Sequence, residues 1–200
     1  IKTPQGNDVH LSLVANPSHL EAVNPVVQGI TYAKCQTMYK GDYKKIMPVL
    51  IHGDAAFAGQ GVNYEQVNMA ALDGYGTYGT VHIILNNQVG FTANYKEGRS
   101  SMYCTDLAKI IDSPVLHVNG DDPEAVYFAA KFALSYRQKF KKDIFIDLLC
   151  YRRHGHNESD EPKFTQPNLY NLISKHPSPR DVYFKRITEK LIPVFDSAGL

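Results

Sequence analysis

Short apolar runs alternate with longer amphipathic stretches along this chain, and the pattern predicts a sheet with helices packed on it. Runs of strand length and apolar character lie at residues 9–14, 49–51, 81–85, 115–118 and 144–149. Helical spacing or helix-start residues predict helices at about 25–38, 63–72, 105–111, 124–140, 168–174 and 180–195. Because strands that alternate with helices form parallel sheets covered on both faces, we predict an α/β fold with a mostly parallel sheet and helices on both faces.

Two of the predicted helices carry apolar stripes, which indicate the face that packs inward. The stripe of the first helix consists of Val26, Ile30, Ala33 and Thr37. The stripe of the helix at 124–140 consists of Phe128, Ala129, Phe132 and Tyr136. We expect these stripes to pack in the core, and for the second we prefer core packing to contact with a cofactor.

Composition adds bounds on size, partners and compartment. Two hundred residues, 44% of them hydrophobic, can bury a core, and we expect an α/β domain at 1–165 followed by a helical extension at 166–200. A net charge of +1 gives no overall field for nucleic acid or a membrane surface, and no apolar run is long enough to span a bilayer. The three cysteines lack the spacing of a metal site, which favours reduced thiols in the cytosol.

Polar side chains follow two of the predicted strands at the point where each strand ends. His52-Gly53-Asp54-Ala55-Ala56 follows the run at 49–51, and Asn86-Asn87 follows the run at 81–85. Ligands of open α/β sheets bind beyond the carboxyl ends of the strands. Carboxylate and amide oxygens suit Mg²⁺, and small residues let backbone N–H groups approach a phosphate. The alternative is that Asp54 caps a helix and Asn87 lies in a turn.

The same residues resemble a known cofactor motif. Gly53-Asp54-Ala55 together with Asn86-Asn87 looks like the thiamine diphosphate motif, which begins with Gly-Asp and ends with Asn-Asn. Longer strings resemble the thiamine-dependent dehydrogenase component of the 2-oxoglutarate dehydrogenase complex, over nearly all of residues 8–184. These strings are HGDAAFAGQGV, NNQVGFT, NPSHLEAVNPVV, HVNGDDPEAV and DLLCYRRHGHNESDEPKFTQP. The resemblance implies a thiamine diphosphate-binding fold.

The resemblance also implies which residues hold the cofactors, thiamine diphosphate and Mg²⁺. Asp54, the side chain of Asn87 and the backbone carbonyl of Val89 would bind the metal. Ala55 and Ala56 would place their backbone N–H groups on the diphosphate. Many relatives have Gly where this chain has Ala55, and Ala is usual in the branch that this chain resembles.

Two polar loops are further candidates. In the resembled family, Ser18 and Leu20 touch the thiamine cofactor, and His19 is a candidate catalytic residue that contacts substrate or diphosphate. The alternative there is a helix cap and a histidine packed in the core. The loop 151–161 forms supporting groups near the cofactor and a dimer interface in the family, while its residues alone fit a salt-bridge network equally well. Residues 91–102 are polar, and we expect them to form a mobile loop.

The implied activity is oxidative decarboxylation of 2-oxoglutarate, with transfer of the succinyl group to a lipoyl-bearing succinyltransferase component. The implied enzyme is a homodimer with a 2-oxo acid substrate, in the bacterial cytosol or the mitochondrial matrix, and neither nucleic acid nor a membrane is expected as a partner. A second α/β domain and upstream substrate-binding residues of the family are not seen here. We therefore expect a fragment that is inactive alone.

Three other functions remain open. A related enzyme that acts on 2-oxoadipate would share all these strings, because substrate length is recognised elsewhere. A non-catalytic assembly module would use the domain mainly as a subunit interface. A nicotinamide-binding fingerprint is poorly supported, because Gly59-Gln60-Gly61 is followed by Tyr64 where the third glycine would stand.

Overall fold

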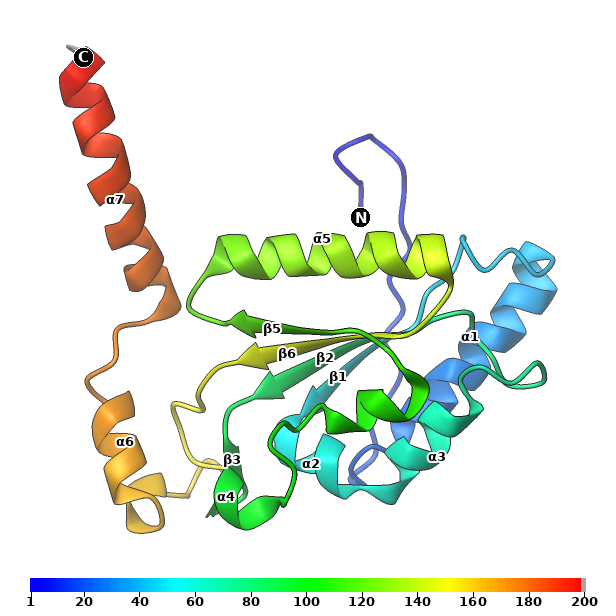
Figure 1. The fold of residues 1–200 in the computed structure, drawn as a ribbon, viewed down its shortest axis with the longest axis horizontal. Coiled ribbons are helices and arrows are strands. Elements are labelled where there is room, and N and C mark those ends of the chain that lie inside the picture. The colour runs from blue at the N-terminus through cyan, green and yellow to red at the C-terminus, as the bar shows by residue number, and fades with distance from the viewer. Residues whose placement is uncertain (199–200) are drawn as a thin grey trace.

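A parallel four-stranded sheet lies at the centre of the computed structural model, which describes residues 1–198, with side chains up to residue 190 (Figure 1). The strands are β1 (Val49–Gly53), β2 (Val81–Asn86), β5 (Val115–Asn119) and β6 (Ile144–Leu149). Their spatial order is β1-β2-β6-β5. The α/β class and four of the five predicted strands are therefore confirmed.

Helices connect and flank these strands. They are α1 (Val23–Tyr39), α2 (Asp54–Gly59), α3 (Gly61–Met69), α4 (Tyr95–Gly98), α5 (Pro123–Phe140), α6 (Pro167–Ile173) and α7 (Pro179–Ala198). Short 3₁₀ segments lie at Asp106–Ile111 and Pro162–Phe164, and β3 (Val89–Gly90) pairs with β4 (Ala93–Asn94) in a small hairpin. No helix in the described part of the chain is long and apolar enough to cross a membrane.

Side chains that alternate along the strands build one core on each face of the sheet. The core on the side of α2 and α3 consists of Phe57, Val67, Ile84, Cys104, Leu107, Ala108 and Phe145. The core beneath α5 consists of Val81, Val118, Ala129, Ala133, Ile144 and Ile146. Since successive residues of β6 contribute to opposite cores, both faces are covered, as predicted (Figure 1).

The chain reverses its direction across the sheet. It passes from β1 to the adjacent β2, then to β5 at the far edge, and returns to β6 between them. The forward steps use helical segments on one face and the return step uses α5 on the other. This arrangement is expected for right-handed crossovers.

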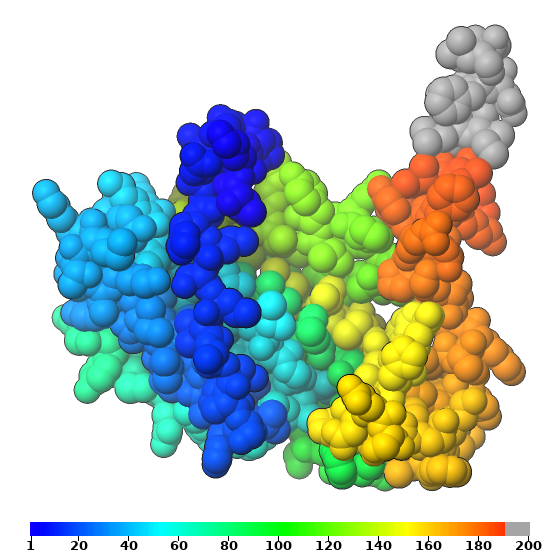
Figure 2. Space-filling view, turned by 180° about the vertical axis from the view of Figure 1, so that it is seen from behind, coloured from blue at the N-terminus to red at the C-terminus, as the bar shows by residue number. Residues whose placement is uncertain are grey.

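The strand predicted at 9–14 is wrong. This segment is extended but pairs with no strand in the described structure, and Leu13 is 100% exposed. The only pairing nearby is an isolated bridge between Lys2 and Asp8. Alternation of apolar residues marks a strand only where a neighbouring strand accepts its backbone hydrogen bonds, and this segment belongs to neither described sheet. Figure 2 shows the dark-blue N-terminal segment running along the surface.

The inward face predicted for α1 is wrong, and that predicted for α5 is confirmed at Ala129 and Tyr136 but wrong at Phe128 and Phe132. The buried residues of α1 are Asn24, Gln28, Thr31 and Cys35, and those of α5 are Ala129, Ala133 and Arg137. Phe128 is 69% exposed, although Ala129 beside it is buried. Small alanine side chains allow α5 to lie close to the sheet, and the aromatic side chains flank this contact. α1 instead packs through hydrogen bonds, such as the 3.0 Å bond from Gln28 Nε2 to Thr80 Oγ1.

The two C-terminal helices lie beside the sheet and not on its faces (Figure 1). α7 is connected to the start of α5 by Arg186, which donates to Asp122 and Glu124 at 2.6 Å each. Asp122 is also the N-cap of α5, where its side chain accepts backbone N–H groups. The predicted domain boundary at residue 165 stays a prediction.

Candidate functional site

The predicted metal ligands lie at one edge of the sheet. β1 and β2 pair in parallel along their whole length, so Asp54 and Asn87 follow them at the same edge. The hairpin strand β3 lies against the first turn of α2, because a methyl group placed on Gly90 would be 2.6 Å from Cβ of Ala55. The structure therefore brings Asp54 and Ala55 close to the segment that carries Asn87 and Val89.

Asp54 does not act as the cap of a helix, which was one alternative. Gly53 is the N-cap of α2 and Asp54 is the first residue inside the helix. The Asp54 carboxylate forms an ion pair with Nη1 of Arg99 at 3.2 Å. Asn87 does make the turn contact of the other alternative, because its Oδ1 accepts the N–H of Val89 at 3.1 Å.

Asp54 is a buried carboxylate whose counter-ion in the structure is Arg99. Its side chain is 1% exposed, and burial raises the pKa of the carboxyl group, while the charge and hydrogen bond of Arg99 oppose this shift. No cluster of three or more His, Cys, Asp or Glu residues in the described chain could hold a metal ion. A metal here would thus need amide and carbonyl oxygens, which are the groups that Asn87 and Val89 offer. The residues present fit Mg²⁺ chemistry.

The loop with Ser18, His19 and Leu20 is exposed, so neither the core-histidine nor the helix-cap alternative describes it. α1 begins at Val23 without a side-chain cap. The next residue, Glu21, is buried in a left-handed conformation with φ of 67°. Its carboxylate accepts hydrogen bonds from His52 of β1, and this contact holds the loop beside the strand that leads to Asp54.

A buried chain of four titratable groups starts at Glu21, and sequence reasoning missed it. His52 contacts Glu21 through Nδ1 and His82 through Nε2, the latter at 3.1 Å. His82 Nε2 then lies 3.3 Å from Asp143 Oδ2. The signal for this network in the sequence was a histidine inside each of two otherwise apolar strands, His52 in β1 and His82 in β2.

The pKa values of this chain follow from burial and hydrogen bonding. Burial lowers the pKa of His52, and the hydrogen bond to Glu21 only partly offsets this effect. Burial opposes ionisation of Glu21, but hydrogen bonds from His52 and Asn24 outweigh it and lower the pKa of its carboxyl group. At neutral pH, Glu21 is therefore ionised next to an uncharged His52 ring.

A second buried carboxylate, Asp147 of β6, holds side chains of the neighbouring strands by hydrogen bonds. It accepts the side-chain N–H of Asn86 at 2.9 Å and lies 2.9 Å from Nδ1 of His117. Burial and the charge of Asp147 raise the pKa of the Cys104 thiol to about 12. All three cysteines are free, in agreement with the reduced thiols predicted.

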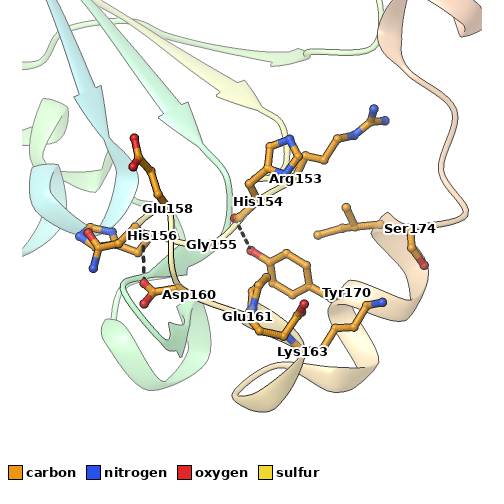
Figure 3. A pocket seen from close by; sticks show the side chains of 13 residues that line it. Arg153, His154, Gly155, His156, Glu158, Asp160, Glu161, Lys163, Tyr170 and Ser174 are labelled. Carbon is orange, nitrogen blue, oxygen red and sulfur yellow. Dashed lines mark hydrogen bonds between the residues drawn. The ribbon is translucent and has the colours of Figure 1, made fainter.

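The loop 151–161 packs on the loop after β3 and forms no ion-pair network in the described structure. Arg152 donates to the carbonyl of Phe91 at 2.9 Å and to the Tyr170 hydroxyl. Tyr170 in turn donates to the carbonyl of His154 at 3.3 Å (Figure 3). A cavity of about 860 Å³ lies here between the loop and α6, and none of the predicted metal ligands lines it. It holds acidic and basic side chains together, so it indicates no ligand class.

Comparison with known proteins identifies the family. Residues 5–192 match the family described as "Dehydrogenase E1 component". The chain is 58% identical to the mitochondrial 2-oxoglutarate dehydrogenase of Dictyostelium discoideum, over 95% of its own length and 19% of the relative's. It is 54% identical to the 2-oxoglutarate dehydrogenase E1 component of Haemophilus influenzae, over 91% of its length and 20% of the relative's. For the same component of Cupriavidus necator the identity is 51%, over 94% and 20%.

These matches cover nearly all of the chain but a fifth or less of each of these relatives. They agree with the family resemblance of the strings that begin HGDAA and NNQVG. These strings lie at the carboxyl edge of the parallel sheet. The fold and the sequence thus lead to one conclusion: the chain belongs to the dehydrogenase E1 component family and corresponds to a segment of its 2-oxoglutarate dehydrogenase members.

Proposed function

We propose that this chain supplies the Mg²⁺- and diphosphate-binding part of a thiamine diphosphate-dependent 2-oxoglutarate dehydrogenase. One observation carries the proposal: the buried carboxylate of Asp54 lies at the sheet edge that also bears Asn87, with β3 packed on the helix that Asp54 begins. A buried anion favours a cationic partner. Arg99 is that partner in the structure, and Mg²⁺ would be a second cation at the same carboxylate.

Each residue has a proposed task. Asp54 and the side chain of Asn87 would bind Mg²⁺ together with the carbonyl of Val89, and the N–H groups of Ala55 and Ala56 would face the diphosphate. When bound, thiamine diphosphate supplies the carbanion chemistry of decarboxylation, and the protein binds and orients it.

The exposed loop before Glu21 would face the other end of the cofactor. Ser18 and Leu20 would contact it, and His19, whose side chain is free of the core, would contact substrate or diphosphate. Glu21 would act on this loop only through its position, because it is bonded to His52 and buried.

The proposed enzyme is a homodimer that transfers the succinyl group to a lipoyl-bearing succinyltransferase component, in the bacterial cytosol or the mitochondrial matrix. The names of the relatives support 2-oxoglutarate as the substrate. Rates of decarboxylation of 2-oxoglutarate and 2-oxoadipate by the full-length protein would test this choice. A clear preference for 2-oxoadipate would contradict it.

Asp54→Asn tests the metal site. The change removes the charge and keeps the size, so we expect Mg²⁺-dependent binding of thiamine diphosphate to weaken about a hundredfold or more. Calorimetric titration of the full-length protein, with and without Mg²⁺, measures this. Asp73→Asn is the matched control, because Asp73 is exposed and lies outside the site. Unchanged, tight binding by Asp54→Asn would refute the assignment, and absence of heat from the unaltered protein would favour an interface module.

A further inference from the structure

Arg99 has an unsatisfied hydrogen-bond donor next to the candidate metal ligand. Its side chain is only 10% exposed, although it follows a short polar loop. Nη1 donates to Asp54 Oδ2 at 3.2 Å, and the guanidinium carbon lies 5.3 Å from the centre of the Tyr95 ring. The Nε–H group is buried and has no hydrogen-bond partner within the described residues. A buried donor left without an acceptor is destabilising, so this N–H indicates a missing acceptor.

The local structure fixes the guanidinium in this place. β3 and β4 are antiparallel, with Val89 paired to Asn94, and this hairpin turns the chain back toward α2. Asn94 then caps α4 through a capping box with Glu97, and Arg99 follows directly after this helix. The hairpin that begins beside Asn87 therefore delivers Arg99 to Asp54, and this cation is not a freely moving surface group.

The chemistry of the missing acceptor follows from charge. The ionised Asp54 carboxylate and the guanidinium cancel each other, and a guanidinium offers five N–H donors in a fixed plane. This plane can donate to a carboxylate on one side and to a phosphate oxygen on another. An anionic oxygen is thus a better match for Nε–H than a neutral group, and the proposed function brings a diphosphate to this edge of the sheet.

We propose that Arg99 is a further cofactor-binding residue, which donates Nε–H to an anionic oxygen of the diphosphate while it keeps Asp54 oriented through Nη1. This inference rests on the proposed function and adds a residue to it. It also means that diphosphate binding fastens the segment 93–99 over the site, because that segment carries Arg99.

The test uses Arg99→Met and Arg99→Lys in the full-length protein, with Arg180→Met as control. Arg180 is a surface arginine whose side chain is 90% exposed. We expect Arg99→Met to weaken binding of Mg²⁺–thiamine diphosphate about tenfold to a hundredfold, which corresponds to one charge-assisted hydrogen bond. Arg99→Lys keeps the charge beside Asp54 without the planar donors, so it should fold like the unaltered protein and bind with intermediate affinity.

Two further measurements separate this role from simple competition with the metal. If Arg99 only occupies the place of the cation, the Arg99→Met variant should bind the cofactor more tightly. It should also bind Mn²⁺ alone more tightly, which electron paramagnetic resonance measures. Tighter cofactor binding would overturn the proposal. Trypsin cleavage after Lys96 should slow when Mg²⁺–thiamine diphosphate binds the unaltered protein, and this protection should be lost in Arg99→Met.

The outcomes distinguish the two proposals. If the unaltered protein binds no thiamine diphosphate, the proposed function fails. If it binds the cofactor, and both Arg99 variants bind equally well with unchanged protection at Lys96, only the role of Arg99 is refuted.

Discussion

The polar side chains beneath the sheet form a continuous hydrogen-bonded chain that links the exposed loop before Glu21 to the opposite edge. His82 stacks on Phe145 with 4.3 Å between ring centres, so the chain runs through an otherwise apolar core. Within it, burial lowers the pKa of His52, and hydrogen bonds outweigh burial to lower the pKa of Glu21. Both shifts have the same consequence for stability in acid.

We predict that the free energy of unfolding falls as the pH drops below about 6.5, the ordinary pKa of histidine. In this range the unfolded chain takes up a proton at His52 that the folded chain refuses, so acid favours unfolding. Glu21 adds a further loss below about 4.5, where the unfolded carboxyl group is protonated first. Denaturant titrations between about pH 7.5 and 5.5, about one unit either side of the ordinary histidine pKa, measure the slope for His52.

The control for this prediction is a second histidine. His52→Asn should flatten the dependence between about pH 6.5 and 5.5, whereas His10→Asn, at an exposed position, should leave it unchanged. Equal slopes for the His52 variant and the unaltered protein would show that another group causes the acid effect.

Among the site residues, the sequence pointed to those that follow strands and missed those that come from loops and strand interiors. Asp54 and Asn87 were predictable because the ends of parallel strands meet at one edge. Arg99 was not, because its approach to Asp54 depends on a hairpin two residues long on each side. Glu21 and His82 were missed because periodicity alone does not distinguish a buried hydrogen-bonded residue from an exposed one.

At the scale of elements, strands were easier to predict than the faces of helices. The runs at 81–85 and 144–149 became central strands, since a nearly continuous apolar run suits burial on both faces. Residues 9–14 failed because pairing needs a partner that sequence pattern does not supply. The stripe on α1 was wrong because mainly polar groups of this helix are buried, and that on α5 was wrong at its two phenylalanines because small alanines make the close contact.

The turn before β2 also depends on close packing. Gly79 has φ of 99°, and an added Cβ would lie 2.6 Å from the carbonyl oxygen of Lys142. The Gly79 carbonyl accepts a 2.9 Å hydrogen bond from Nε of buried Arg137. We predict that Gly79→Ala destabilises the fold by about 2 kcal/mol or more, because backbone strain and a steric clash add.

Gly29→Ala is the matched control for this change, measured by guanidinium denaturation. Gly29 lies inside α1 with open space around it. The added methyl should stabilise the helix by about 0.5–1 kcal/mol, since alanine loses less conformational entropy. Loss of stability of similar size in both variants would contradict the structural argument.

At the scale of the whole molecule, α7 is attached to the sheet domain by polar contacts at the start of α5. Arg186 bonds both Asp122 and Glu124, and this pairing lowers the pKa of the Asp122 carboxyl group. The same carboxylate caps α5, so one residue serves both the helix start and the attachment of α7. Sequence alone predicted this helix but not the attachment of α7, because the two partners of each ion pair lie far apart along the chain.

We predict that Arg186→Met exposes the connection between α6 and α7 to proteases while the sheet domain keeps its denaturation midpoint. The loss of two ion pairs at the protein surface changes global stability little, but it removes the main polar contact that holds the start of α7. Limited proteolysis followed by mass spectrometry measures cleavage at residues 174–178. The Arg180→Met variant should be cleaved at the same rate as the unaltered protein. Equal cleavage rates for the two variants would contradict the prediction.

The insertion of β6 between β2 and β5 has a consequence for synthesis on the ribosome. The strand that completes the middle of the sheet is the last to be made, so a nascent chain that ends before Ile144 has two strands with open inner edges. Such edges recruit other unfinished chains. Synthesis of β6 is therefore the step after which these inner edges are paired and no longer available for co-aggregation.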